Sequence, residues 1–109
     1  MYCIYFDEEI WKPIINEPKM GDNKYEVSSH GRVRNIITGH ILGLSISNNG
    51  YVRVTVNDRR TNKKKNTHLS VHRLVASAFL YNDASSIKCE VNHKDGDKTN
   101  NHYENLEWV

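Results

Sequence analysis

Three polar residues near the C-terminal end, Asn92, His93 and Asn105, could together carry out a hydrolytic reaction. A neutral imidazole can take a proton from water, and the ordinary histidine pKa of about 6.5 suits that task at cellular pH. Asn92 places a carbonyl oxygen beside the ring, and hard divalent cations prefer oxygen ligands. Asn105 can hydrogen-bond backbone groups and hold two strands at a fixed spacing. Together these residue types favour phosphodiester hydrolysis assisted by a metal ion.

A second group of residues could bind a polyanion. Residues 23–82 hold ten Lys and Arg against two Asp and Glu, whereas residues 83–109 hold three against six. Each contact between a cation and a phosphate releases counterions, so this asymmetry favours a nucleic-acid partner over a merely solvated charged surface. The predicted phosphate contacts are Arg32, Arg34, Arg53, Arg59, Arg60, Lys63, Lys64 and Lys65.

Other interpretations of the histidines stay open. His93 could cap a surface turn without any chemical role. Cys89, His93 and His102 could be zinc ligands, although the sequence has no CxxC pair and no fourth ligand at a familiar spacing. His72 stands at the start of a segment with an apolar face, so we expect it to be packed rather than catalytic.

The elements that must position these residues are short. Residues 51–56 alternate between valine and polar side chains, which predicts a half-buried strand. The preceding Asn49-Gly50 pair predicts a two-residue hairpin turn. Apolar residues at helical spacing predict a helix near residues 71–80. Strands are expected at residues 88–93 and 105–109, with a polar loop between them.

Length and composition limit the class of protein. A chain of 109 residues suits one domain, or two small modules that share a core. No apolar run approaches the roughly 18 residues of a membrane helix, so no membrane partner is expected. The N-terminal stretch MYCIYFDEEIW has acidic residues and no basic region typical of a signal peptide. Two cysteines without a framework of spacings favour a reducing compartment, and hence a cytoplasmic location.

Several segments, in this order along the chain, resemble the HNH (His-Me finger) endonucleases of the phage and intron-homing branch. The stretches IWKPI, YEVSSHGRVRN and GYVRVTV resemble the nuclease-associated modular domain that precedes HNH cores, and VHRLVASAF with EVNHKDGDKTNNHYENLEWV resembles the core itself. The resemblance covers almost the whole chain. It implies a DNA-binding region over residues 1–57 and an HNH-like core over residues 58–109. The core contains a basic hairpin with its tip at residues 59–65, a helix and a terminal pair of strands.

The resemblance also implies roles for the three polar residues. The position of His93 is that of the general base, and the position of Asn92 helps to bind a single Mg²⁺-type ion. The position of Asn105 is structural and orients the base. The implied function is a DNA endonuclease of phage or mobile-element origin that cleaves double-stranded DNA in the cytoplasm of a bacterial cell.

The sequence departs from that family pattern at the metal site. The family continues into a helix that supplies another metal ligand, whereas this sequence stops at Val109, and Asn92 is a weaker ligand than a carboxylate. We therefore expect an α+β fold in which short antiparallel strands accompany a ββα-metal core lacking its final helix. We also expect weak Mg²⁺ binding, little nuclease activity, and association through the surface around Trp108, with a homodimer as one option. The alternative function is a catalytically defective HNH-fold protein that binds DNA or inhibits.

Overall fold

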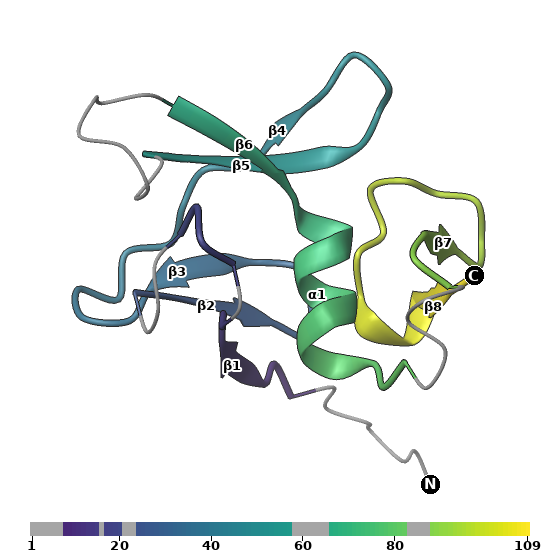
Figure 1. The fold of residues 1–109 in the computed structure, drawn as a ribbon, viewed down its shortest axis with the longest axis horizontal. Helices are drawn as coiled ribbons and strands as arrows, with labels where there is room; N and C mark the ends of the chain where they lie inside the picture. The colour runs from purple at the N-terminus through teal and green to yellow at the C-terminus, as the bar shows by residue number, and fades with distance from the viewer. Residues whose placement is uncertain (1–7, 16, 21–23, 58–65, 83–87) are drawn as a thin grey trace, which may run out of the picture.

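Three small antiparallel sheets surround one helix in the structure, a computed structural model that describes residues 8–15, 17–20, 24–57, 66–82 and 88–109 (Figure 1). The predicted α+β class with short antiparallel strands is confirmed. The elements are β1 (Trp11–Pro13), β2 (Tyr25–Ser28), β3 (Val33–Asn35), β4 (Ser45–Ile46), β5 (Val52–Asn57), β6 (Asn66–Ser70), α1 (Val71–Phe79), β7 (Val91–His93), the 3-10 turn η1 (Tyr103–Asn105) and β8 (Leu106–Trp108).

The β4–β6 sheet confirms the predicted alternation and corrects the predicted turn. Val52, Val54 and Val56 are buried on one face of β5, because side chains one residue apart point to opposite faces of a strand. The turn before β5 is longer than the two-residue Asn49-Gly50 hairpin expected from the sequence. The amide of Gly50 donates to the carbonyl of Ser47, so Asn48 and Asn49 are the central residues. Gly50 follows them with a φ of +86°, a conformation that glycine tolerates.

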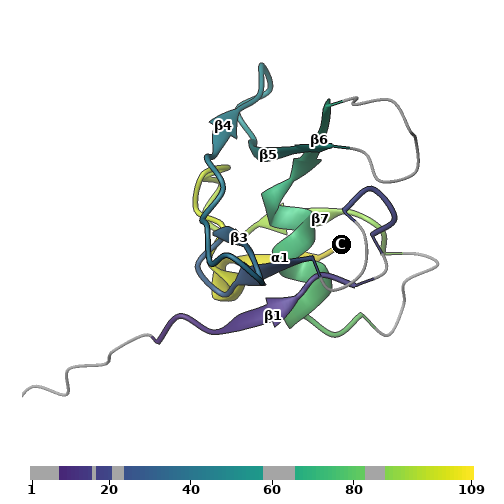
Figure 2. The ribbon, with the colours of Figure 1, turned by 90° about the vertical axis from the view of Figure 1, so that its left-hand side faces the viewer.

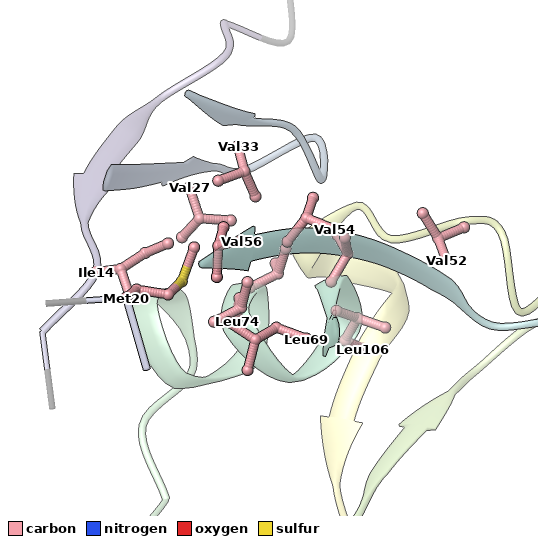
Figure 3. Close-up of a cluster of buried hydrophobic side chains, with 12 residues drawn as sticks. Ile14, Met20, Val27, Val33, Val52, Val54, Val56, Leu69, Leu74 and Leu106 are labelled. Carbon is pink, nitrogen blue, oxygen red and sulfur yellow. The ribbon is translucent and has the colours of Figure 1, made fainter. Parts of the chain in front are cut away.

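Helix α1 follows β6 directly and lies between the sheets. It begins where the sequence predicts and ends one residue earlier. Its buried face carries Val71, Leu74 and Val75, which pack with valines of β5 (Figure 3). Ser70 occupies the N-cap position, but its side chain makes no capping hydrogen bond. The helix is therefore held by its hydrophobic face, as is usual for short helices.

The β1–β3 sheet shares the same core. Val27 of β2 pairs with Val33 of β3, and both side chains are fully buried. Figure 3 shows them near Val56, so the core joins the first sheet to the second. In two perpendicular views, α1 runs from the β4–β6 sheet towards β1 (Figures 1 and 2). The regions 1–57 and 58–109 predicted from the sequence thus contribute to one hydrophobic core.

The β7–β8 hairpin packs against α1 on the side opposite the β1–β3 sheet (Figure 1). Leu106 of β8 is 2% exposed and joins the core. The indole N–H of Trp108 donates to the carbonyl of Leu80, 3.2 Å away, just after the end of the helix. Among the residues that the structure describes, no helix has the length and apolar character needed to cross a membrane.

Candidate active site

His93 is the last residue of β7 and points into the interior. Its partner across the hairpin is Leu106, while the neighbouring pair is Asn92 with Glu107. Because side chains alternate along a strand, Asn92 is exposed and His93 is 93% buried. The hairpin therefore separates the predicted base from the predicted metal ligand by face, although the two residues adjoin in the sequence.

The loop after His93 is folded by its own carboxylates. Asp95 accepts a hydrogen bond from the amide of Asp97, and Asp97 accepts hydrogen bonds from the amide and the hydroxyl of Thr99. Hydrogen bonds stabilise the charged form of a carboxylate, so they lower its pKa. The side chain of Asn100 has the largest effect on the pKa of Asp95, and the hydroxyl of Thr99 has the largest effect on that of Asp97.

Asn105 braces this loop from the opposite end. Its side-chain NH₂ donates to Asp95 and to the carbonyl of Asn100, at 2.9 Å in each case. Its side-chain oxygen accepts from the amide of Asp95, and its backbone oxygen accepts from the amide of Lys94. Asn105 thus ties the loop together through backbone and side-chain groups, and the orienting role that the family resemblance implies for it stays a prediction.

The residue that hydrogen-bonds the imidazole of His93 is Asn101, which the sequence analysis did not identify. Nε2 of His93 lies 2.8 Å from Oδ1 of Asn101, and both side chains are buried. A carbonyl oxygen can only accept, so Nε2 carries the hydrogen and Nδ1 holds the lone pair of the neutral ring. Asn101 stands among several polar loop residues, and no spacing marks it in the sequence as the one that turns inward.

Two further rings line the same interior. The ring centroid of His72, on α1, is 5.1 Å from that of His93 and 5.0 Å from that of Tyr51. His72 is packed, as its position in the sequence had suggested, and its buried Nδ1 has no hydrogen-bond partner among the residues that the structure describes. Burial, followed by electrostatic interactions with His93 and Arg73, lowers the pKa of His72 to about 4. A neutral ring therefore packs beside His93 at neutral pH.

Lys98 adds a cation that the sequence analysis did not assign to this site. Its Nζ donates to the carbonyl of Asn49 at 2.9 Å and lies 4.7 Å from the ring centroid of Tyr51. The loop after β7 thereby contacts the turn between β4 and β5. In the sequence, Lys98 is a single lysine between Asp97 and the Asn100-Asn101 pair. Nothing in that pattern distinguishes it from an ordinary solvated lysine.

The described residues provide a small set of oxygen ligands for a divalent cation. No group of three or more His, Cys, Asp or Glu side chains lies close enough to hold a metal within the described part of the chain. Asn92 donates its NH₂ to Glu107 at 2.9 Å, so both residues present an oxygen on the exposed face of the hairpin. Mg²⁺ is often bound by one or two protein oxygens together with water and substrate phosphate. This donor set fits a cation that is held weakly until phosphate is present.

The predicted phosphate contacts fall into three groups. Arg59, Arg60, Lys63, Lys64 and Lys65 lie outside the described residues. Arg53 is half-buried on β5, where its Nε is 3.3 Å from the hydroxyl of Ser45.

Arg32 and Arg34 form the third group, and both make ion pairs within the protein. Arg32 pairs with Glu9 and Arg34 with Glu26, and both guanidinium groups lie over the ring of Trp11, at 5.5 Å and 3.9 Å from its centroid. The hydrogen bond from Arg32 lowers the pKa of Glu9 to about 2. These two arginines therefore contribute to the β1–β3 sheet, and their charges are partly neutralised there.

Comparison with known proteins adds the family context. Residues 70–109 match the family described as HNH endonuclease, and residues 9–57 match the NUMOD4 motif. Two proteins of Acanthamoeba polyphaga mimivirus, described as uncharacterized HNH endonucleases L247 and L245, are 43% and 42% identical over 99% and 91% of the chain. DNA endonuclease I-HmuI of Bacillus phage SP01 is 36% identical over 91% of the chain.

A solved structure is similar as well. The structure described as DNA binding and cleavage by the HNH homing endonuclease I-HmuI matches 92% of the chain with a TM-score of 0.68 and 36% identity. The chain spans 25% and 26% of the length of the two mimivirus proteins and 51% of the length of I-HmuI. The similarity thus covers nearly all of this chain but only part of each relative.

Proposed function

This chain belongs to the phage-type HNH endonucleases, and on that premise we propose that it binds double-stranded DNA and hydrolyses phosphodiester bonds with His93 as the general base. HNH endonucleases generally use a divalent metal ion. The whole protein's activity and partners are part of the proposal, because the chain spans only a fraction of its relatives.

The observation that carries the proposal is the buried hydrogen bond between Nε2 of His93 and Oδ1 of Asn101. It assigns the proton of the neutral ring to Nε2, so Nδ1 is the nitrogen that can accept a proton from water. A histidine that only capped a turn would not need a buried partner for its second nitrogen. Such a partner is the arrangement by which enzymes fix the tautomer of a basic imidazole.

In the proposed reaction, Nδ1 of His93 removes a proton from water while the water oxygen attacks phosphorus. The bond between phosphorus and the leaving sugar oxygen breaks, and that oxygen takes a proton from solvent. Asn101 stabilises the imidazolium that forms, because the ring still donates from Nε2. We propose that Asn92 and Glu107 would hold the divalent cation once their side chains turn from the exposed face of the hairpin towards a phosphate at His93, where the cation would supply neutralising charge. Mg²⁺ is the ion expected.

The alternative function is supported by the weakness of that cation site. Asn92 contributes a neutral oxygen where a carboxylate would bind a divalent cation more strongly. A chain of this kind could bind DNA, or act as an inhibitory protein, without cleaving DNA. The weak Mg²⁺ binding and little nuclease activity predicted from the sequence therefore remain our expectation.

DNA binding in this proposal uses the basic residues of the middle segment. Arg53 remains a predicted phosphate contact, and so do the five cations of residues 59–65, which lie outside the described residues. Arg32 and Arg34 remain predictions too, and contact with phosphate would have to compete with Glu9 and Glu26.

Nicking of supercoiled plasmid by the purified 109-residue chain, with and without Mg²⁺, tests the proposed function. His93→Ala should reduce the cleavage rate by roughly 10²–10⁴-fold and leave DNA affinity unchanged, since a general base acts on the rate. His40→Ala removes an exposed histidine from the loop after β3 and is the matched control. Absence of Mg²⁺-dependent nicking by the wild-type chain would favour the alternative, and nicking that survives in His93→Ala would contradict the assigned base.

Two predictions from the sequence stay predictions. A cytoplasmic location is compatible with the free, exposed thiol of Cys89. A homodimer would use the surface around Trp108, where a groove of about 820 Å³ runs between β1, α1 and the end of the hairpin. Light scattering at high protein concentration would distinguish a dimer from a monomer.

A further inference from the structure

We propose that the turn Ser28–Gly31, in the region that matches the NUMOD4 motif, positions the proposed general base by fixing Asn101. Gly31 is the positioning residue in this account, acting on His93 through Asn101. The inference rests on the proposed function of His93. It adds that the N-terminal region is a structural part of the catalytic site, whether or not it also contacts DNA.

The turn is made rigid by buried hydroxyl groups. Ser28 is fully buried, and its hydroxyl oxygen accepts hydrogen bonds from the amides of His30 and Arg32, at 3.2 Å and 3.0 Å. The hydroxyl of Ser29 accepts from the amide of Ile10 at 3.0 Å. Buried polar groups that are satisfied in this way hold one conformation, because any other would leave them unpaired.

Three successive residues of the loop between β7 and β8, Asn101, His102 and Tyr103, contact this turn. The amide of Tyr103 donates to the carbonyl of Ser29 at 2.9 Å, and the ring of His102 stacks on that of His30 with centroids 5.1 Å apart. Asn101 comes next and approaches Gly31. The turn and the loop are therefore joined by a backbone hydrogen bond, a stack of two rings and the close approach of Asn101 to Gly31.

The approach at Gly31 leaves no room for a side chain. A Cβ atom built on Gly31 would lie 2.9 Å from Cβ of Asn101 and 3.3 Å from its carbonyl oxygen. Gly31 also has a φ of +92°, which other residues rarely adopt. Asn101 is thus confined between the turn on one side and Nε2 of His93, 2.8 Å from its Oδ1, on the other. Displacing Asn101 away from Gly31 must alter that hydrogen bond.

A matched pair of glycine substitutions separates this role from general backbone strain. Gly39 has a similar φ of +73°, but a Cβ built there meets nothing within 4 Å. Gly31→Ala and Gly39→Ala therefore impose comparable strain on the backbone, and only the first pushes on Asn101. If the two variants differ in how readily the hydrogen bond of His93 opens, the difference reports the contact with Asn101 rather than a loss of stability.

Nitrogen-15 NMR of the purified chain, at about pH 8 so that an ordinary histidine ring is neutral, measures exchange of the Nε2-bound proton of His93 with water. We expect that proton to be protected in the wild type and in Gly39→Ala. In Gly31→Ala and in Asn101→Ala its exchange should become faster by about tenfold or more, since opening the hydrogen bond exposes the donor. Equal exchange in Gly31→Ala and Gly39→Ala would overturn the inference.

Should Gly31→Ala fail to fold, Ser28→Ala takes its place, because it loosens the turn without adding atoms near Asn101. Faster exchange at His93 in a folded Ser28→Ala chain supports the proposal, and unchanged exchange overturns it. The readout needs no cleavage. A wild-type chain that fails to nick DNA would therefore contradict the proposed function, whereas a His93 proton insensitive to the turn would contradict the coupling.

Discussion

The β4–β6 sheet with α1 and the β7–β8 hairpin with its loop are held together by different forces. The first region buries alternating valines of β5 against the helix. In the second, Leu106 is the only buried hydrophobic side chain among residues 88–109, and polar side chains such as Asp95 and Asn105 fold the loop. Hydrophobic burial has no direction, whereas hydrogen bonds require defined distances and angles. The first region thus supplies stability, and the second sets the geometry around His93.

Replacing the one hydrophobic anchor of the hairpin should have the largest effect on stability. Leu106→Ala removes a side chain that is 2% exposed, so we expect a loss of about 2–5 kcal/mol in the free energy of unfolding. Urea denaturation followed by tryptophan fluorescence measures it. Leu44→Ala, at a leucine that is 47% exposed, is the control and should change little. Equal small losses would mean that the hairpin does not depend on the shared core.

Removing the polar brace of the loop should have a smaller, local effect. Asn105→Ala deletes three side-chain hydrogen bonds, which we expect to lower the free energy of unfolding by roughly 1–3 kcal/mol. Amide hydrogen exchange should accelerate in residues 94–100 before it does in β5. If β5 and the loop lost protection together, the two regions would not differ in the way described.

Acid should destabilise the protein through His72. Its folded-state pKa is depressed from 6.5 to about 4, so the unfolded chain binds the proton more readily and stability falls as pH falls through that window. The loss should be roughly 1–2 kcal/mol. Urea midpoints at several pH values measure it, and His72→Phe, which keeps a ring but cannot titrate, should flatten the dependence. An equally steep dependence in His72→Phe would assign the effect to other groups.

The smallest change concerns the exposed face of the hairpin. Asn92→Asp replaces the hydrogen bond to Glu107 with two opposed carboxylates, which should cost about 0.2–1 kcal/mol without metal. Calorimetric titration with MgCl₂ should show tighter binding than in the wild type, and Mg²⁺ should restore the melting temperature. Unchanged Mg²⁺ affinity would remove Asn92 from the proposed cation site.

The same contrast explains what the sequence could and could not predict. The alternation at residues 51–56 and the apolar spacing at residues 71–80 were sufficient to place β5 and α1, because burial follows from periodicity. The turn at Asn48 and Asn49 was predicted one residue out of place, since neighbouring asparagines offer several turn registers. The strand predicted over residues 88–93 placed His93 at a strand end, which is where β7 ends.

The partners of His93 lay beyond that reasoning. Asn101 differs from Asn100 only in facing inward, and that orientation comes from the contact with Gly31, seventy residues earlier in the chain. Pairing of Arg32 and Arg34 with glutamates likewise depends on strand register in the first sheet. Contacts set by tertiary packing leave no local periodicity to detect.

We propose that catalysis depends on Asn101, which holds the Nε2 proton of His93 and so prepares Nδ1 as the base. Single-turnover nicking of plasmid DNA by excess protein, with DNA affinity measured in parallel, tests it most directly. Asn101→Ala should lower the rate by roughly 10–100-fold, the size seen when a partner that orients a functional histidine is removed, and leave affinity unchanged. A rate equal to that of the wild type, or a rate loss fully matched by lost affinity, would contradict the claim.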